Sequence, residues 1–289
     1  MTSKTRPGMK LAFSTLGCPS WEMEEIARAA ASYGYEGIEL RALGGSLNLL
    51  ERPEFQPSVI KRTRAFLTDH NLSVCCVDTS CSFDAIEQKT RCENIETAAR
   101  YGELAEALGA PLIRVFPNEI PEGATREETR DRIAASLCEA AQRMPDGVCV
   151  GLETHGDFAR GSTAAEIVRL ADHPKLTIIW DAANSFAAGD TIAESARAVH
   201  PFLTHVHLRD ARPSNEVHPW RPVLAGCGLV PLAEVVRLLQ EANYDGYLSF
   251  EWEKYWHPEI EGPETALPDF AAAMRQIFRE CMKEAGGRE

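Results

Sequence analysis

Four consecutive apolar segments in the second half of the chain each end near a side chain that can bind a metal ion or carry a proton. In chain order these side chains are Glu153, Asp181, His207 and Glu251. A single carboxylate after an apolar run usually caps a helix or forms a surface ion pair. The same pattern in four consecutive segments indicates a common site instead.

The two-residue period of a β-strand indicates which other polar side chains share a face with these four. His155 lies two residues after Glu153, and Arg209 lies two residues after His207. If all four strand-end residues face inward, three carboxylates and one imidazole converge. Carboxylates at close range raise each other's pKa, and a divalent cation is the usual compensation. The pattern therefore predicts one divalent ion, and the donor set suits Mn²⁺, Mg²⁺, Co²⁺ or Zn²⁺ without choosing among them.

The four candidate ligands can meet only if the strands that carry them end on the same side of the sheet. The sequence alternates apolar or β-branched runs with segments of helical period. The predicted strands are Lys10–Phe13, Gly37–Arg41, Ser73–Asp78, Pro111–Phe116, Val148–His155, Leu176–Asp181, Leu203–Asp210 and Tyr247–Glu253. The predicted helices are Trp21–Tyr33, Ser58–His70, Asn94–Leu108, Arg126–Arg143, Ser162–Ala171, Ile192–Val199, Pro231–Ala242 and Pro268–Glu284.

Matched strands and helices without a Ser/Gly/Pro-rich linker predict one α/β domain, a single (β/α)8 TIM barrel over residues 1–289. Residues 1–8 and about 285–289 are expected to fray. A doubly wound open sheet is the alternative, but no GxGxxG or phosphate-loop pattern follows a predicted strand. In a barrel of this kind the active site lies at the carboxyl ends of the strands, where the four candidate ligands fall.

Charge and composition argue against several classes of function. The 289 residues include 30 Lys+Arg and 43 Asp+Glu, and this net charge of −13 does not favour a nucleic-acid partner. No segment approaches the roughly 18 apolar residues of a membrane helix. The apolar stretch near the N-terminus is too short for a signal peptide. Nine Cys without CxxC spacing indicate reduced thiols and a cytoplasmic protein, and homo-oligomerisation stays open.

The motifs around these positions resemble those of the xylose-isomerase-like barrel superfamily of sugar and sugar-phosphate isomerases and epimerases. The resemblance spans nearly the whole chain. It is carried by Gly37-Ile-Glu-Leu40, Gly151-Leu-Glu-Thr-His155, Trp180-Asp-Ala-Ala-Asn184, His205-Val-His-Leu-Arg-Asp210, Gly226-Cys-Gly228 and Tyr244-Asp-Gly-Tyr-Leu-Ser-Phe-Glu251. For members with one metal ion, the resemblance implies that the ligands are Glu153, Asp181, His207 and Glu251.

The resemblance also implies an activity, which is isomerisation or epimerisation of a small carbohydrate: a ketose, keto-polyol or sugar phosphate. Glu153 and Glu251 would both bind the metal and exchange protons with carbon, one abstracting a proton and the other returning one. A metal-dependent lyase acting on an inosose- or dehydroshikimate-like keto-polyol is the alternative, and a barrel that only binds sugar is a third. Related abasic-site endonucleases need further histidines on the third and fourth strands, where this chain has Asp78 and Arg114.

Four further residues are candidates for substrate binding. His155 and Arg209 are expected above the metal ligands at the barrel mouth, with a purely structural role as the alternative. Arg114 would be costly to bury unpaired in an apolar strand, so an ion pair with an inward carboxylate such as Glu39 explains it as well as contact with substrate does. Asn184 stands where many epimerases carry a His that contacts substrate hydroxyls.

Overall fold

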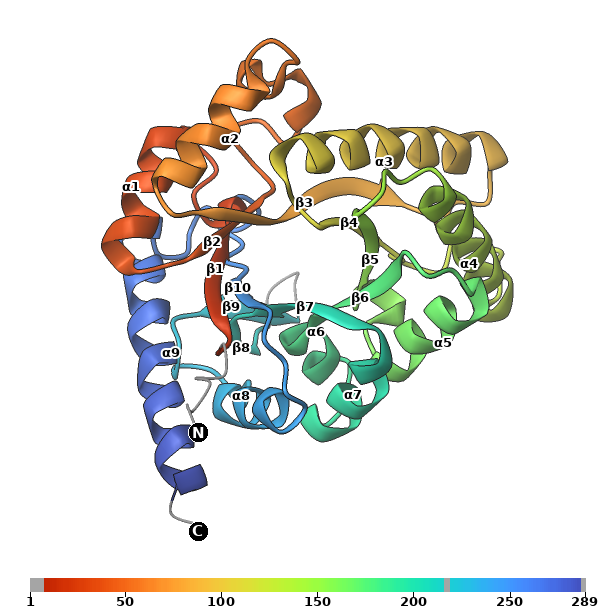
Figure 1. Cartoon of the computed structure of the whole chain (residues 1–289). Coiled ribbons are helices and arrows are strands. Elements are labelled where there is room, and N and C mark those ends of the chain that lie inside the picture. Colours follow the sequence, from red (N-terminus) through yellow and green to blue (C-terminus); the bar gives the residue numbers. More distant parts are fainter. Residues whose placement is uncertain (1–7, 216–218, 287–289) are drawn as a thin grey trace, which may run out of the picture.

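The computed structural model describes residues 8–215 and 219–286 of the chain. Parallel strands close into a barrel in the order β1-β10-β7-β6-β5-β4-β3-β2, and helices surround it (Figure 1). The barrel strands are β1 (Lys10–Ser14), β2 (Gly37–Leu40), β3 (Ser73–Ser82), β4 (Leu112–Phe116), β5 (Cys149–Glu153), β6 (Leu176–Asp181), β7 (Leu203–Leu208) and β10 (Tyr247–Phe250). This architecture confirms the predicted (β/α)8 TIM barrel.

Helices cover the outside of the barrel. They are α1 (Met23–Tyr33), α2 (Ile60–Asp69), α3 (Gln88–Leu108), α4 (Arg126–Gln142), α5 (Gly161–Ala171), α6 (Ala182–Ala187), α7 (Ile192–Val199), α8 (Leu232–Glu241) and α9 (Pro263–Gly286). Short 3-10 turns lie at Thr15–Gly17, Leu49–Glu51, Pro53–Phe55, Gly156–Phe158 and His200–Phe202. None of the helices within residues 8–215 and 219–286 is long and apolar enough to cross a membrane.

The strands are buried on both faces, which is why they consist of near-continuous apolar runs. Ile38, Val206 and Leu248 are fully buried. The residues that alternate with such outward side chains point into the barrel, and there the polar residues of the site replace part of the usual apolar filling. The fold thus builds a stable shell around an interior that is polar at one end.

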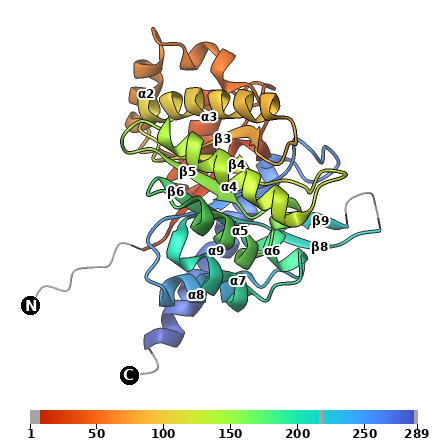
Figure 2. The same ribbon diagram turned by 90° about the vertical axis from the view of Figure 1, so that its right-hand side faces the viewer.

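The structure departs from the predicted elements where the chain leaves the barrel. The run predicted as Leu203–Asp210 ends as a barrel strand at Leu208, because Asp210 begins a separate antiparallel hairpin, β8 (Asp210–Pro213) with β9 (Trp220–Val223), that extends beyond the barrel (Figure 2). The short helix α6 was not predicted. Helix α9 begins at Pro263, since proline suits a first helical position. The fraying expected for residues 1–8 and 285–289 falls mainly outside the described residues.

Asp210 anchors the base of this loop. Its Oδ1 accepts hydrogen bonds from the backbone N–H groups of Ala211 and Val230, at 2.9 and 3.1 Å. Its Oδ2 accepts from those of Gly226 and Gly228, at 2.9 and 2.8 Å. A Cβ at Gly228 would lie 2.2 Å from Asp210 Oδ1, so only glycine permits this approach. The Gly226-Cys-Gly228 motif is therefore part of a buried loop anchor.

We expect Asp210→Asn to lower the free energy of unfolding by about 3 kcal/mol, because the amide keeps one acceptor oxygen and turns an NH₂ group toward N–H donors. Urea denaturation followed by circular dichroism measures the loss. Asp146→Asn is the control, because the Asp146 side chain is fully exposed, and it should leave the unfolding midpoint unchanged. Equal midpoints for the two variants would contradict the anchoring role.

Candidate metal centre and active site

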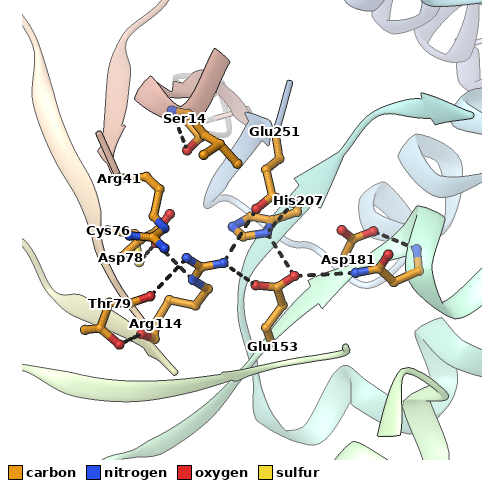
Figure 3. A network of polar contacts seen from close by, with 12 residues as sticks. Ser14, Arg41, Cys76, Asp78, Thr79, Arg114, Glu153, Asp181, His207 and Glu251 are labelled. Carbon is orange, nitrogen blue, oxygen red and sulfur yellow. Dashed lines mark hydrogen bonds and ion pairs between the residues drawn. The ribbon is translucent and has the colours of Figure 1, made fainter. Parts of the chain in front are cut away.

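Four neighbouring strands bring the predicted ligands together at one end of the barrel (Figure 3). Glu153 and Asp181 are the last residues of β5 and β6, His207 is the penultimate residue of β7, and Glu251 directly follows β10. Each side chain offers one ligand atom, and these atoms all lie within 4.8 Å of one another. All four side chains are buried. The expected convergence of three carboxylates and one imidazole is thus what the strand ends produce.

Glu39 on β2 orients the imidazole of this cluster. Its Oε2 lies 2.6 Å from His205 Nε2 and 3.0 Å from His207 Nε2. The Nε2–H of His207 is thereby directed to Glu39, while Nδ1 points toward the carboxylates, 3.3 Å from Glu251 Oε2. Within the described part of the chain, this buried Nδ1 has no aligned hydrogen-bond partner. A nitrogen ligand held this way, facing three carboxylates, fits a divalent cation.

Arg114 has a different carboxylate partner from the one that its sequence context led us to expect. Its Nη1 donates to Glu153 Oε2 at 2.8 Å and lies 3.7 Å from Glu251 Oε1, and its Nε lies 3.6 Å from Asp78 Oδ1. Arg114 therefore pairs with inward carboxylates, as expected, but Glu39 is not among them. The register explains why: Asp78 pairs with Arg114 across β3 and β4, whereas Glu39 pairs with Cys76, so Arg114 lies one inward layer nearer the barrel mouth.

Burial and charged neighbours drive the pKa values of Glu153 and Glu251 apart. Burial raises the pKa of Glu251 to about 7, against the opposing effect of His207 and with a further rise from Glu153. Burial also acts to raise the pKa of Glu153, but the Arg114 guanidinium outweighs it and holds that pKa well below its usual range. For His207, burial acts to lower the pKa, yet Glu39 and Glu251 raise it well above its ordinary value.

Arg209 and Asn184 lie against the same cluster. Arg209 Nη1 contacts the Asp181 carboxylate and lies 3.1 Å from Glu251 Oε2, and Nη2 donates to Asn184 Oδ1 at 2.8 Å. The backbone N–H of Asn184 donates to Asp181 Oδ1, also at 2.8 Å. Both residues are thus where substrate-binding candidates were expected, although in this structure they contact the candidate ligands.

His155 lies beside the cluster and outside it. Its ring packs on Phe116 with the ring centroids 4.7 Å apart. Its buried Nδ1 has no hydrogen-bond partner among the residues that the structure describes. The imidazole therefore presents one free nitrogen near the carboxyl end of β5, which suits contact with a bound molecule.

Three buried polar residues of the site were not identified as such from the sequence. They are Glu39, Asp78 and Arg41. The pattern that identified the other site residues also applies to these three. Glu39 alternates with the apolar residues Ile38 and Leu40, and Asp78 and Arg41 end the strands predicted as Ser73–Asp78 and Gly37–Arg41. Nothing in the sequence indicates which charges meet across the barrel, and that decides their roles.

Glu39→Gln should weaken Mn²⁺ binding by about 10- to 100-fold, because the amide cannot hold both imidazoles with an ionised oxygen and His207 loses its fixed tautomer. Isothermal titration calorimetry with Mn²⁺ measures the change. Glu36→Gln, three residues earlier and exposed, is the matched control. Unchanged Mn²⁺ affinity in Glu39→Gln would remove Glu39 from the centre.

Mn²⁺ affinity should rise between about pH 6 and about pH 8, because ligands must lose their protons before they bind a cation. Without a cation, the raised pKa values of Glu251 and His207 keep protons on these groups at the acid end of this range. Calorimetry in buffers of different ionisation enthalpy should detect proton release on binding. In Glu251→Gln, fewer protons should be released per ion. Affinity that is independent of pH would contradict this ligand set.

Comparisons with known proteins agree with this architecture. A model of the xylose isomerase-like TIM barrel family matches residues 27–277, whereas comparison with curated proteins finds no match. Solved structures of similar fold include an L-ribulose 3-epimerase, with a TM-score of 0.77 and 14% identity over 96% of this chain and 97% of that chain. The IolI protein with a bound zinc atom has a TM-score of 0.76 and 17% identity over 93% of this chain and 98% of that chain.

A third similar structure is that of the probable 3-DHS dehydratase AsbF from Bacillus anthracis, with a TM-score of 0.72 and 20% identity over 92% of this chain and 98% of that chain. At these identities the likeness is one of fold. The family model, by contrast, covers most of the sequence and nearly all barrel strands. The chain belongs to the xylose isomerase-like TIM barrel family.

Proposed function

We propose that the protein is a divalent-metal-dependent isomerase or epimerase that moves protons on carbon next to the carbonyl of a ketose, keto-polyol or sugar phosphate. The observation that carries this proposal is the buried convergence of Glu153, Asp181, His207 and Glu251 at the carboxyl ends of adjacent barrel strands. Such a cluster is unfavourable without a cation, and its place is where barrels of this kind hold their chemistry.

A bound divalent ion would be held by Glu153, Asp181, Glu251 and Nδ1 of His207, and it would supply a Lewis acid that stabilises negative charge on substrate oxygens. The donor set of three carboxylates and one imidazole leaves Mn²⁺, Mg²⁺, Co²⁺ and Zn²⁺ as candidates. Glu39 serves this centre by holding the Nε2–H of His207, so that Nδ1 faces the carboxylates.

Glu153 and Glu251 are the proposed proton-transfer pair. Glu153 stays ionised beside Arg114 and can accept a proton from carbon. Glu251, as a ligand, would be ionised when an ion is bound, and it would return to carbon a proton that it has taken up during turnover. A pair of carboxyl groups at one centre suits these two roles. Because they come from different strands, they can approach a substrate carbon from different directions.

Four residues around the pair are the proposed substrate contacts. Arg209 and Asn184, joined by a hydrogen bond, lie beside Asp181 and can donate to substrate hydroxyl groups. Arg114 lies between the carboxylates of Glu153 and Asp78, where it can hold an oxygen that develops negative charge. His155 offers its unused nitrogen from the end of β5.

His155 also favours a second candidate function, a lyase. After the same proton abstraction, a keto-polyol can lose a β-hydroxyl group if an acid protonates the leaving oxygen. The free Nδ1 of His155 faces no hydrogen-bond partner within the described chain and is suited to that task. The substrate of such a lyase would be an inosose- or dehydroshikimate-like keto-polyol.

Incubation of the Mn²⁺-loaded protein with ketoses and inososes in D₂O separates these functions. Deuterium uptake at carbon indicates proton transfer, and the product mass distinguishes isomerisation from loss of water. Loss of water that disappears in His155→Ala, while exchange persists, would favour the lyase. No exchange with any compound would contradict both enzymatic functions and leave a sugar-binding barrel.

Glu153→Gln and Glu251→Gln should each reduce turnover by at least about 100-fold, because each amide keeps one ligand oxygen but no longer transfers a proton. If the two groups act on different proton positions, one variant should still exchange substrate deuterium without forming product. Mass spectrometry in D₂O measures both. Glu36→Gln, an exposed glutamate, is the control. Full turnover in Glu251→Gln would reduce Glu251 to a ligand.

A further inference from the structure

The candidate metal ligands occupy one half of the barrel, on the adjacent strands β5, β6, β7 and β10. The other half, formed by β4, β3, β2 and β1, carries a second group of buried polar side chains. Its cations are Arg114 from β4 and Arg41, which directly follows β2 (Figure 3). The metal-ligand half also holds Arg209, and the other half also holds the carboxylates of Glu39 and Asp78.

Arg41 differs from the other buried arginines of the site in its partners. Arg114 and Arg209 each form ion pairs with carboxylates. Arg41 is 4% exposed, its Nη2 donates to Ser80 Oγ at 2.8 Å, and it forms no ion pair with any described residue. Its Nη1 is buried without a hydrogen-bond partner in the described chain. Asp78 and Glu251 attract this guanidinium from beyond ion-pair distance, but burial and the charge of Arg114 outweigh them. A buried guanidinium that contacts no counter-charge directly is costly, so this position favours an anion from outside the chain.

The direction of the side chain places the charge of Arg41 at the mouth of the barrel. Arg41 lies two residues after Glu39, whose carboxylate points into the barrel toward His205 and His207. The two-residue period therefore puts Arg41 on the same inward face, one layer nearer the carboxyl ends of the strands. Burial and the nearby positive charge of Arg114 lower the pKa of Arg41 to about 10, which leaves it charged at neutral pH.

The number of donors indicates the kind of anion. The groups available at this position are Nη1 of Arg41 and the hydroxyl of Ser80, next to the paired guanidinium of Arg114. These two donor groups match the two oxygens of a planar carboxylate monoanion. A phosphate dianion has three terminal oxygens and usually finds a set of backbone N–H groups at the start of a helix. A carboxylate is the better match.

We propose that Arg41 binds a carboxylate group of the substrate, so that the protein acts on a keto-polyol acid in preference to a neutral sugar. The carbonyl end of this substrate would face Glu153 and Glu251, and its carboxylate would reach across the barrel mouth to Arg41. This inference rests on the proposed function and deepens it by naming the substrate class. Arg41 is then a residue that determines specificity.

Calorimetry on the Mn²⁺-loaded protein tests this with two matched sets of probes. The open-chain set is D-fructose, 5-keto-D-gluconate and D-fructose 6-phosphate, and the cyclic pair is scyllo-inosose and 3-dehydroshikimate. In at least one set, the carboxylate should bind at least about 10-fold more tightly than its neutral counterpart, as a charge-assisted hydrogen bond to a buried group implies.

Arg41→Gln should remove this preference while leaving the weak binding of the neutral probes unchanged. Arg41→Lys, which keeps the charge but loses the forked donors, should retain part of it and serves if Arg41→Gln fails to fold. Arg212→Gln, an exposed arginine on β8, is the control. Equal affinity for acid and neutral probes, a preference that survives in Arg41→Gln, or tighter binding of the phosphate would overturn the proposal. Absence of binding by every acid would do the same.

Deuterium exchange on the same probes keeps this inference separate from the proposed function. Acid binding that depends on Arg41 without any exchange would contradict the proton-transfer function and keep the carboxylate site. Exchange on neutral ketoses without an effect of Arg41→Gln would keep the function and overturn the carboxylate site. Each proposal therefore has an outcome that contradicts it alone.

Discussion

Repulsion among buried carboxylates is the constraint on which the rest of the site depends. Glu153, Asp181 and Glu251 end neighbouring strands within a few ångströms of one another. Three negative charges in so small a buried space are unfavourable unless positive charge compensates them. Arg114 and Arg209 supply part of it directly. This requirement explains why cations occupy inward positions that most barrels of this kind fill with Val, Ile or Leu.

The fold and the membership of the site could be predicted because both depend on local patterns. The alternation of strand and helix segments indicates the barrel, and the polar ends of β5 and β6 identify Glu153 and Asp181. Parallel strands bring such ends together whatever lies between them. A two-residue period then adds residues such as Arg209. In each case the information lies within a few neighbouring residues of the sequence.

The partners of the buried charges could not be predicted, because they depend on how strands are staggered across the barrel. Arg114 meets Glu153 and Asp78 and not Glu39, owing to a register that no single segment encodes. The hairpin that begins at Asp210 was missed for a related reason. No Gly or Pro interrupts the sequence between β7 and Pro213, and only the backbone bonds of the loop separate the two elements.

The loop anchor at Asp210 has a consequence for how members of this fold can diverge. One carboxylate ties together the two ends of the long segment between β7 and α8, through Ala211 on one side and Gly226, Gly228 and Val230 on the other. The residues between Ala211 and Gly226 can therefore change in number and composition, while Arg209, next to Asp210, keeps its position. Selection can therefore change this rim of the barrel without rebuilding the buried polar cluster beneath it.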